Sequence, residues 1–136
     1  EALIGSETDV VANMANLCAA LKEAFRWFWI GFYIVRGQEL ILGPFQGPIA
    51  CTRIQFAKGV CGTAWAEQKS QLVPDVEAFA GHIACSSLSK SELVVPIFKD
   101  EQVWGVLDID STKIADFDHT DQIEIEKLMT WFATCL

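Results

Sequence analysis

Three of the five cysteines, Cys51, Cys61 and Cys85, lie where a thiol can do chemistry. Each is in a loop or at the boundary of an expected element, whereas Cys18 is on the apolar stripe of one expected helix and Cys135 is in the last turn of another. A thiol becomes a nucleophile only as the thiolate, which a helix N-terminus or a positive neighbour promotes and an apolar core opposes. The three thiols are therefore candidates for nucleophilic or redox chemistry, with ordinary small structural residues as the alternative for each.

Carboxylates form the second chemical feature, in the segment LDID. If this segment is a strand, the alternation of side chains places Asp108 and Asp110 on one face. Glu92 opens the preceding expected strand and joins them if the register of the hairpin allows it. Carboxyl groups crowded into a pocket raise the pKa of at least one of them, so that the cluster can hold a ligand cation and also supply a proton. The alternative is a solvated face of the sheet.

His82 and Cys85 form an H-x-x-C pair, which suggests two further kinds of site. A zinc site normally takes four ligands at short spacings, but Cys61 and Cys51 lie 24 and 34 positions from Cys85, and the sequence has no C-x-x-C pair. A protease-type Cys-His dyad needs an oxyanion loop, and the sequence offers no clear one. The chain is also short for an enzyme of that type. We therefore expect neither a metal nor another cofactor.

Composition limits the class of protein. The chain has 136 residues, of which 51% are hydrophobic and 21% charged, and this predicts one domain over residues 1–136. The net charge of −8, without a basic cluster, argues against nucleic-acid binding, and the longest apolar run, 27–35, is too short to cross a membrane. The odd number of cysteines favours a reducing compartment, hence the cytoplasm. Because the chain begins at Glu1, we expect a native N-terminal segment to have been trimmed.

The hydrophobic pattern predicts an α+β fold. Helices are expected over about 8–25 and from about 118 to the end, with a short helix within 58–69. Residues 75–91 show no period and predict a long loop, of a length that often carries function. This order predicts a central antiparallel sheet with helices against one face. The expected strands are 26–35, 40–45, 51–56, 70–74, 92–100 and 101–110, with Pro96 at an edge or a bulge.

An ordered set of residues extends from the first helix to the last: Trp29, GFY at 31–33, GP at 43–44 and 47–48, Cys51, GVCG with Cys61, Cys85, Glu92 in SELVVPI, and GVLDIDS at 105–111. This set resembles the free methionine-(R)-sulfoxide reductases, which are built on a GAF domain. GVLDIDS alone also occurs in other GAF domains. The three cysteines at their spacings of 10 and 24 residues, together with the acidic trio, are the specific part of the resemblance.

The resemblance implies a single GAF domain, with the N- and C-terminal helices on one face of the sheet and a ligand pocket on the other. It implies thioredoxin-dependent reduction of free L-methionine (R)-S-oxide to L-methionine, through a Cys85 sulfenic acid and a Cys51–Cys85 disulfide, in a homodimer. It also implies the residue roles: Cys85 as attacking thiol, Cys51 as resolving thiol, Cys61 as secondary thiol, Glu92, Asp108 and Asp110 around the ammonium and the sulfoxide oxygen, and Trp29 and Tyr33 against the S-methyl group.

Two other functions remain open from the sequence. A sensory GAF module would bind a small ligand without turning it over. A redox sensor would use Cys51 and Cys85 to report oxidant and would have no substrate. Turnover of separated sulfoxide epimers distinguishes an enzyme from both.

Overall fold

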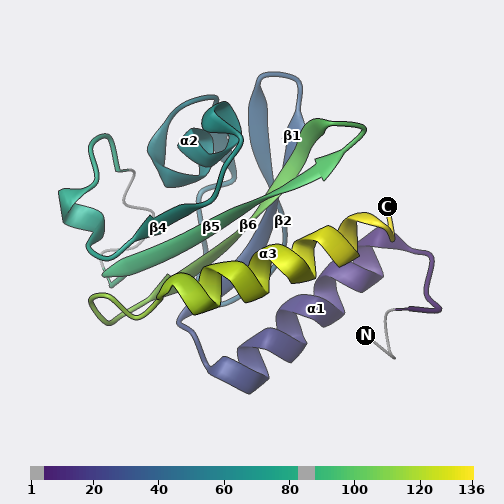
Figure 1. Cartoon of the computed structure of the whole chain (residues 1–136), viewed down its shortest axis with the longest axis horizontal. Coiled ribbons are helices and arrows are strands. Elements are labelled where there is room, and N and C mark those ends of the chain that lie inside the picture. Colours follow the sequence, from purple (N-terminus) through teal and green to yellow (C-terminus); the bar gives the residue numbers. More distant parts are fainter. Residues whose placement is uncertain (1–4, 83–87) are drawn as a thin grey trace.

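The computed structural model describes residues 5–82 and 88–136. Within them, six strands form one sheet in the order β3-β2-β1-β6-β5-β4, and every neighbouring pair is antiparallel (Figure 1). The elements are α1 (Val10–Phe25), β1 (Trp29–Arg36), β2 (Glu39–Gln46), β3 (Arg53–Gln55), α2 (Gly59–Glu67), β4 (Gln71–Val73), the 3-10 turn η1 (Val76–Ala78), β5 (Ser91–Lys99), β6 (Gln102–Ser111) and α3 (His119–Ala133).

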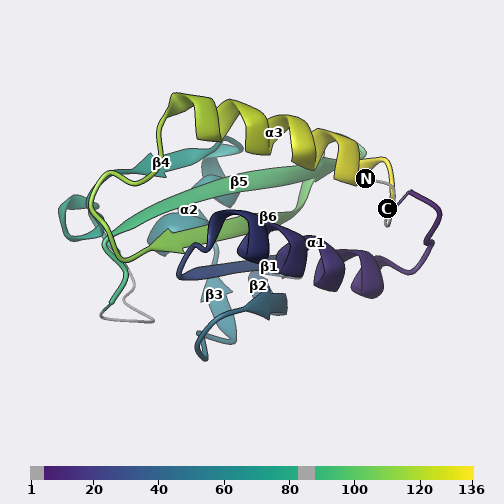
Figure 2. The ribbon, with the colours of Figure 1, turned by 90° about the horizontal axis from the view of Figure 1, so that it is seen from below.

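One face of the sheet packs against α1 and α3 (Figure 2). Helix α1 lies over β1 and β2, and α3 lies over β5. Both helices bury an apolar stripe, with Met14 and Cys18 on α1 and Met129 and Phe132 on α3, each at most 1% exposed. These stripes meet Phe32 of β1 in one continuous apolar core. The α+β fold, with the terminal helices on one face, is confirmed.

The opposite face carries α2 and a second apolar cluster. Strand alternation separates the two faces: in β6, Leu107 and Ile109 belong to the helix-side core, whereas Val106 belongs to the α2-side cluster. Asp108 and Asp110 share the side of Val106, because residues two apart point the same way. The apolar alternation of β6 therefore turns its two aspartates away from the main core and toward α2.

Element boundaries differ from the sequence expectations in a few places. Helix α1 begins at Val10, because the side chain of Asp9 caps it by accepting a hydrogen bond from the Ala12 amide at 2.9 Å. Strand β3 is short, so Cys51 precedes it instead of opening it. The expected 75–91 loop contains η1. Pro96 lies in β5 beyond Val94, the last residue that pairs with β4, and just before a register shift, which agrees with the expected edge or bulge.

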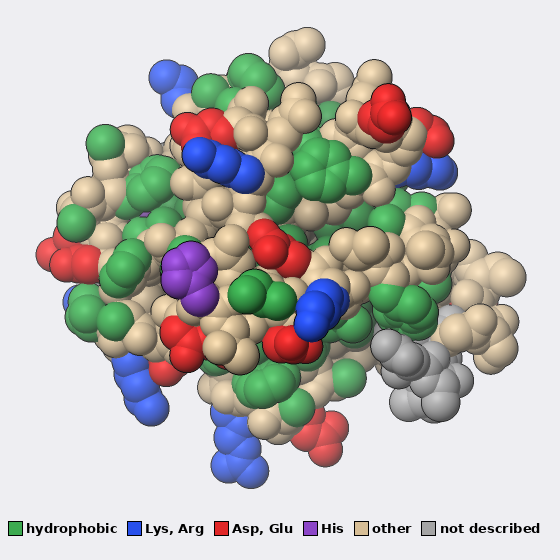
Figure 3. All heavy atoms as spheres, in the orientation of Figure 1, with side chains coloured by type: hydrophobic (Ala, Val, Ile, Leu, Met, Phe, Trp, Pro, Cys, Tyr) green, Lys and Arg blue, Asp and Glu red, His purple; other side chains and the backbone are tan. Residues whose placement is uncertain are grey.

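The distribution of charged side chains on the surface agrees with the acidic composition. On the face shown in Figure 3, lysine and arginine side chains are scattered among acidic and apolar ones. Among the described helices, none combines the length and apolar character needed to cross a membrane.

Candidate active site

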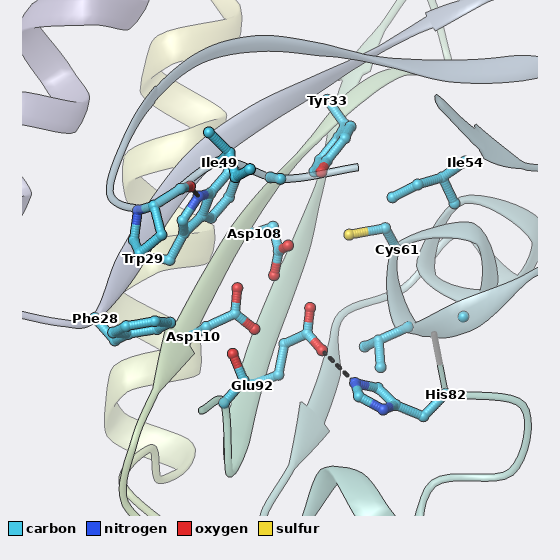
Figure 4. Close-up of a pocket in the computed structure, with 15 residues that line it drawn as sticks. Phe28, Trp29, Tyr33, Ile49, Ile54, Cys61, His82, Glu92, Asp108 and Asp110 are labelled. Carbon is cyan, nitrogen blue, oxygen red and sulfur yellow. Dashed lines mark hydrogen bonds and ion pairs between the residues drawn. The ribbon is translucent and has the colours of Figure 1, made fainter. Parts of the chain in front are cut away.

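A pocket opens on the α2 side of the sheet (Figure 4). Strands β1, β5 and β6 form its floor, and α2 and the loops after β2 and η1 form its walls. It encloses about 600 Å³ of space, part of it open to solvent. The lining residues are Phe28, Trp29, Tyr33, Pro48, Ile49, Ala50, Ile54, Gly59, Val60, Cys61, His82, Ser89, Glu92, Asp108 and Asp110.

Three carboxylates converge on the floor of this pocket (Figure 4). Asp108 and Asp110 come from β6, and Glu92 comes from β5, where it is the register partner of Asp110. Glu92 and Asp108 are each only 6% exposed. The prediction that the two aspartates share a face and that Glu92 joins them is confirmed, and the alternative of a solvated face is wrong.

Burial is the main influence on the acidity of these groups. Loss of hydration raises the pKa of Glu92 and of Asp110 well above their ordinary values, and the charge of Asp108 raises both further. Burial also raises the pKa of Asp108, although hydrogen bonding to Glu92 and Cys61 opposes this rise. A desolvated cluster of carboxyls favours proton uptake. The pocket can therefore hold a protonated carboxyl at a pH where an exposed one is ionised.

This cluster should make the ligand-free protein less stable as the pH rises. The folded state keeps protons that the unfolded chain releases above its ordinary pKa, 3.8 for Asp and 4.5 for Glu. The stabilising contribution is complete below those values and is lost as the pH rises through the raised pKa values of the folded state. Urea unfolding at several pH values from about 5 to 8 should show a falling free energy of unfolding, with a smaller fall in Asp108→Asn. An equal fall in both proteins would contradict this origin.

Cys61 lies in the first turn of α2 and is only 3% exposed. Its sulfur points toward Asp108 (Figure 4). Burial, followed by the charges of Asp108 and Glu92, raises the pKa of the Cys61 thiol well above its ordinary value. The expected position at an element boundary is confirmed, but the residue is buried in the α2-side apolar cluster, which the sequence did not indicate. Desolvation and carboxylates here outweigh the effect of a helix N-terminus on the thiol.

Of the other two cysteines of the trio, the structure describes Cys51 but not Cys85. Cys51 is half-buried in the loop before β3, and its backbone carbonyl accepts a hydrogen bond of 2.8 Å from the Tyr33 hydroxyl. Cys85 lies outside the described residues, so its predicted pairing with Cys51 and its role stay predictions. Cys18 is a buried free thiol in the helix-side core, as expected for a structural cysteine.

Aromatic side chains form the apolar wall of the pocket. Trp29 and Tyr33 stack at a centroid distance of 6.0 Å, and the Trp29 indole donates a hydrogen bond of 3.0 Å to the Pro48 carbonyl. Glycine at position 31 makes room for this wall, because a Cβ there would lie 2.5 Å from the Trp29 ring and 2.4 Å from Phe45 Cβ. Burial raises the pKa of the Tyr33 hydroxyl, which keeps it a neutral donor. Both residues line the pocket, and their contact with an S-methyl group stays a prediction.

His82 joins the site, although the sequence placed it only in a hypothetical zinc pair or dyad with Cys85. Its Nε2 lies 3.9 Å from Oε1 of Glu92, and its side chain is 16% exposed. The signal that could have found it is its place in the long 75–91 loop, next to a candidate thiol.

Fold and pocket together define a GAF domain. A family model described as "GAF domain" matches residues 6–136. The chain is 46% identical, over 94% of its length and 78% of the relative's, to a free methionine-R-sulfoxide reductase of Escherichia coli. It is 44% identical, over 94% of its length and 76% of the relative's, to one of Saccharomyces cerevisiae.

A solved structure agrees with these relatives. The free methionine-R-sulfoxide reductase of Neisseria meningitidis, determined in complex with its substrate, is similar to this chain with a TM-score of 0.97 and 54% identity. The similarity covers 98% of this chain and 81% of that one. The chain belongs to the free methionine-R-sulfoxide reductases, a family of oxidoreductases built on a GAF domain.

Proposed function

We propose that this protein, as one GAF domain over residues 1–136, reduces free L-methionine (R)-S-oxide to L-methionine through a Cys85 sulfenic acid and a Cys51–Cys85 disulfide. The observation that carries the proposal is the trio of Glu92, Asp108 and Asp110 in one pocket, with Glu92 and Asp108 buried and Asp110 half-buried. A cation such as an ammonium offsets the charge of such a trio, and a protonated member can donate to an oxygen.

The chemistry needs both a thiol and an acid. The Cys85 thiolate attacks the sulfoxide sulfur while a carboxyl of the trio protonates the oxygen, because an unprotonated sulfoxide oxygen is a poor leaving group. The substrate S–O bond then breaks as the hydroxyl passes to the Cys85 sulfur, and the bond between Cys85 and the substrate sulfur breaks as the thioether L-methionine leaves. Cys85 is thereby oxidised to the sulfenic acid by the two electrons that reduce the sulfoxide. The Cys51 thiol then condenses with the sulfenic acid, which forms the disulfide and releases water.

Pocket shape and charge support selection of a free amino acid. The three carboxylates provide a place for an ammonium group, which a methionine residue inside a polypeptide does not have. Trp29 and Tyr33 form an apolar wall for the S-methyl group. Peptide-bound methionine sulfoxide should therefore be a poor substrate.

The remaining parts of the proposal concern reduction and assembly. Thioredoxin reopens the disulfide by thiol exchange, which suits a cytoplasmic protein. Cys61 serves as a secondary resolving thiol, and its raised pKa supports this lesser role over that of the first nucleophile. We also propose a homodimer, which analytical ultracentrifugation tests. A monomer at working concentrations would contradict that part alone.

An assay with separated epimers tests the activity. The pure protein, thioredoxin, thioredoxin reductase and NADPH are mixed with free methionine (R)-sulfoxide, and NADPH oxidation is followed. We expect turnover with the R epimer, none with the S epimer, and none with an N-acetylated peptide that contains methionine sulfoxide. Binding of the R epimer without NADPH oxidation would favour the sensory module instead.

A further inference from the structure

The pocket contains a set of side chains suited to a metal ion. One ligand atom each from Cys61, Glu92 and Asp108 lies within 4.8 Å of the other two, and all three residues are buried. They come from α2, β5 and β6, three elements that pack against one another, so the fold itself holds them together. No lysine or arginine is among the described residues that line the pocket.

A second observation points to a ligand at the same place. Oδ1 of Asp108 is buried and has no hydrogen-bond partner among the described residues, and Asp108 as a whole is only 6% exposed. Its carboxylate points into the pocket, toward the Cys61 sulfur (Figure 4). A buried acceptor without a donor is unfavourable, and a bound cation relieves this.

We propose that Cys61, Glu92 and Asp108 bind a thiophilic divalent cation such as Zn²⁺, and that the bound ion keeps substrate out of the pocket. A thiolate together with carboxylates suits Zn²⁺ and not Mg²⁺ or Ca²⁺, which prefer oxygen ligands alone. In a tetrahedral site the ligand atoms lie about 3.5 Å apart, so small side-chain rotations would complete the site. The fourth position stays open to water.

The ion and the substrate would compete, because both need the Asp108 carboxylate. Zn²⁺ would therefore act as a reversible inhibitor that raises the apparent KM for the sulfoxide and leaves kcat unchanged. The Zn²⁺ site goes beyond the proposed activity, and its binding test needs no substrate. The competition rests on the proposed function.

Titration of the reduced protein with Co²⁺ tests the site. A thiolate bound to Co²⁺ gives a charge-transfer band in the near ultraviolet, which carboxylates alone do not give. We expect this band in the wild type and in Cys135→Ser. This matched control removes a free thiol that does not line the pocket. We expect its loss in Cys61→Ser. A band of full strength in Cys61→Ser would place the ion on other thiols and overturn the proposal.

A second variant covers the case in which Cys61→Ser fails to fold. Asp108→Asn should weaken Zn²⁺ binding, measured by competition with a chromogenic chelator, by more than about 100-fold. Asp100→Asn, in the turn between β5 and β6, should bind Zn²⁺ as the wild type does. Addition of free L-methionine (R)-S-oxide should release the ion. Equal Zn²⁺ affinity in the two variants would overturn the site. No release by the sulfoxide, from a protein that turns the sulfoxide over, would overturn the competition.

Discussion

Replacing Cys85 by serine is expected to reduce the turnover of free methionine (R)-sulfoxide by at least about 1,000-fold. A serine hydroxyl cannot accept the oxygen as a stable sulfenic acid, so no other step of the cycle can begin. Steady-state NADPH oxidation in the thioredoxin-coupled assay measures this loss. Cys135→Ser should retain wild-type turnover, because that thiol lies in the turn after α3.

Replacing Cys51 should have a different kinetic signature. The first attack remains possible, so Cys51→Ser should release about one mole of L-methionine per mole of protein and then slow sharply. Cys61 is the remaining thiol in the pocket, and its high pKa should make it a slow substitute. The double variant Cys51→Ser, Cys61→Ser should therefore stop after the burst, and quenched-flow product analysis shows this directly. Sustained equal turnover in the Cys85 and Cys51 variants would remove both role assignments.

The strands and the two faces of the sheet could be predicted, because apolar and polar side chains alternate along a strand with a period of two residues. In β6, the pattern of Leu107 and Ile109 against Asp108 and Asp110 fixes which residues face the helices. The register that brings Glu92 beside Asp110 was harder to predict from the sequence. The tight turn between β5 and β6, at Asp100 and Glu101, forms a hairpin, but the register shift after Ile97 changes the pairing in a way that local sequence does not specify.

The burial of Cys61 and the entry of His82 into the pocket were not predicted, because both depend on long-range packing. The local sequence predicts Cys61 at an element boundary, because it lies two residues after the start of α2. Its burial depends on β6 and the α2-side cluster, which are distant in the sequence. His82 likewise enters the pocket only because its loop returns to Glu92. Local propensity predicts elements, whereas the acidity of a group depends on neighbours that only the folded chain supplies.

Asp108→Asn is expected to lower kcat/KM for the free sulfoxide by about 100- to 1,000-fold, the range for loss of a positioned acid or a buried charge contact. An amide has nearly the shape of the carboxylate but cannot donate an acidic proton or neutralise an ammonium. The fold should survive, since the neutral side chain removes a desolvated charge from the pocket floor. Coupled kinetics, with the Asp100→Asn variant as a matched control, measure the effect.

The form of that loss separates two roles for the carboxylate. If Asp108 protonates the sulfoxide oxygen, kcat falls and KM changes little; if it holds the ammonium, KM rises and kcat is largely kept. A substrate analogue that lacks the amine sharpens the distinction, because a variant that has lost the ammonium contact should no longer prefer the amino acid over the analogue. Glu92→Gln, measured in parallel, should show the complementary pattern if the two residues divide the roles. Wild-type kinetics in both variants would show that Asp108 and Glu92 do not contact the substrate.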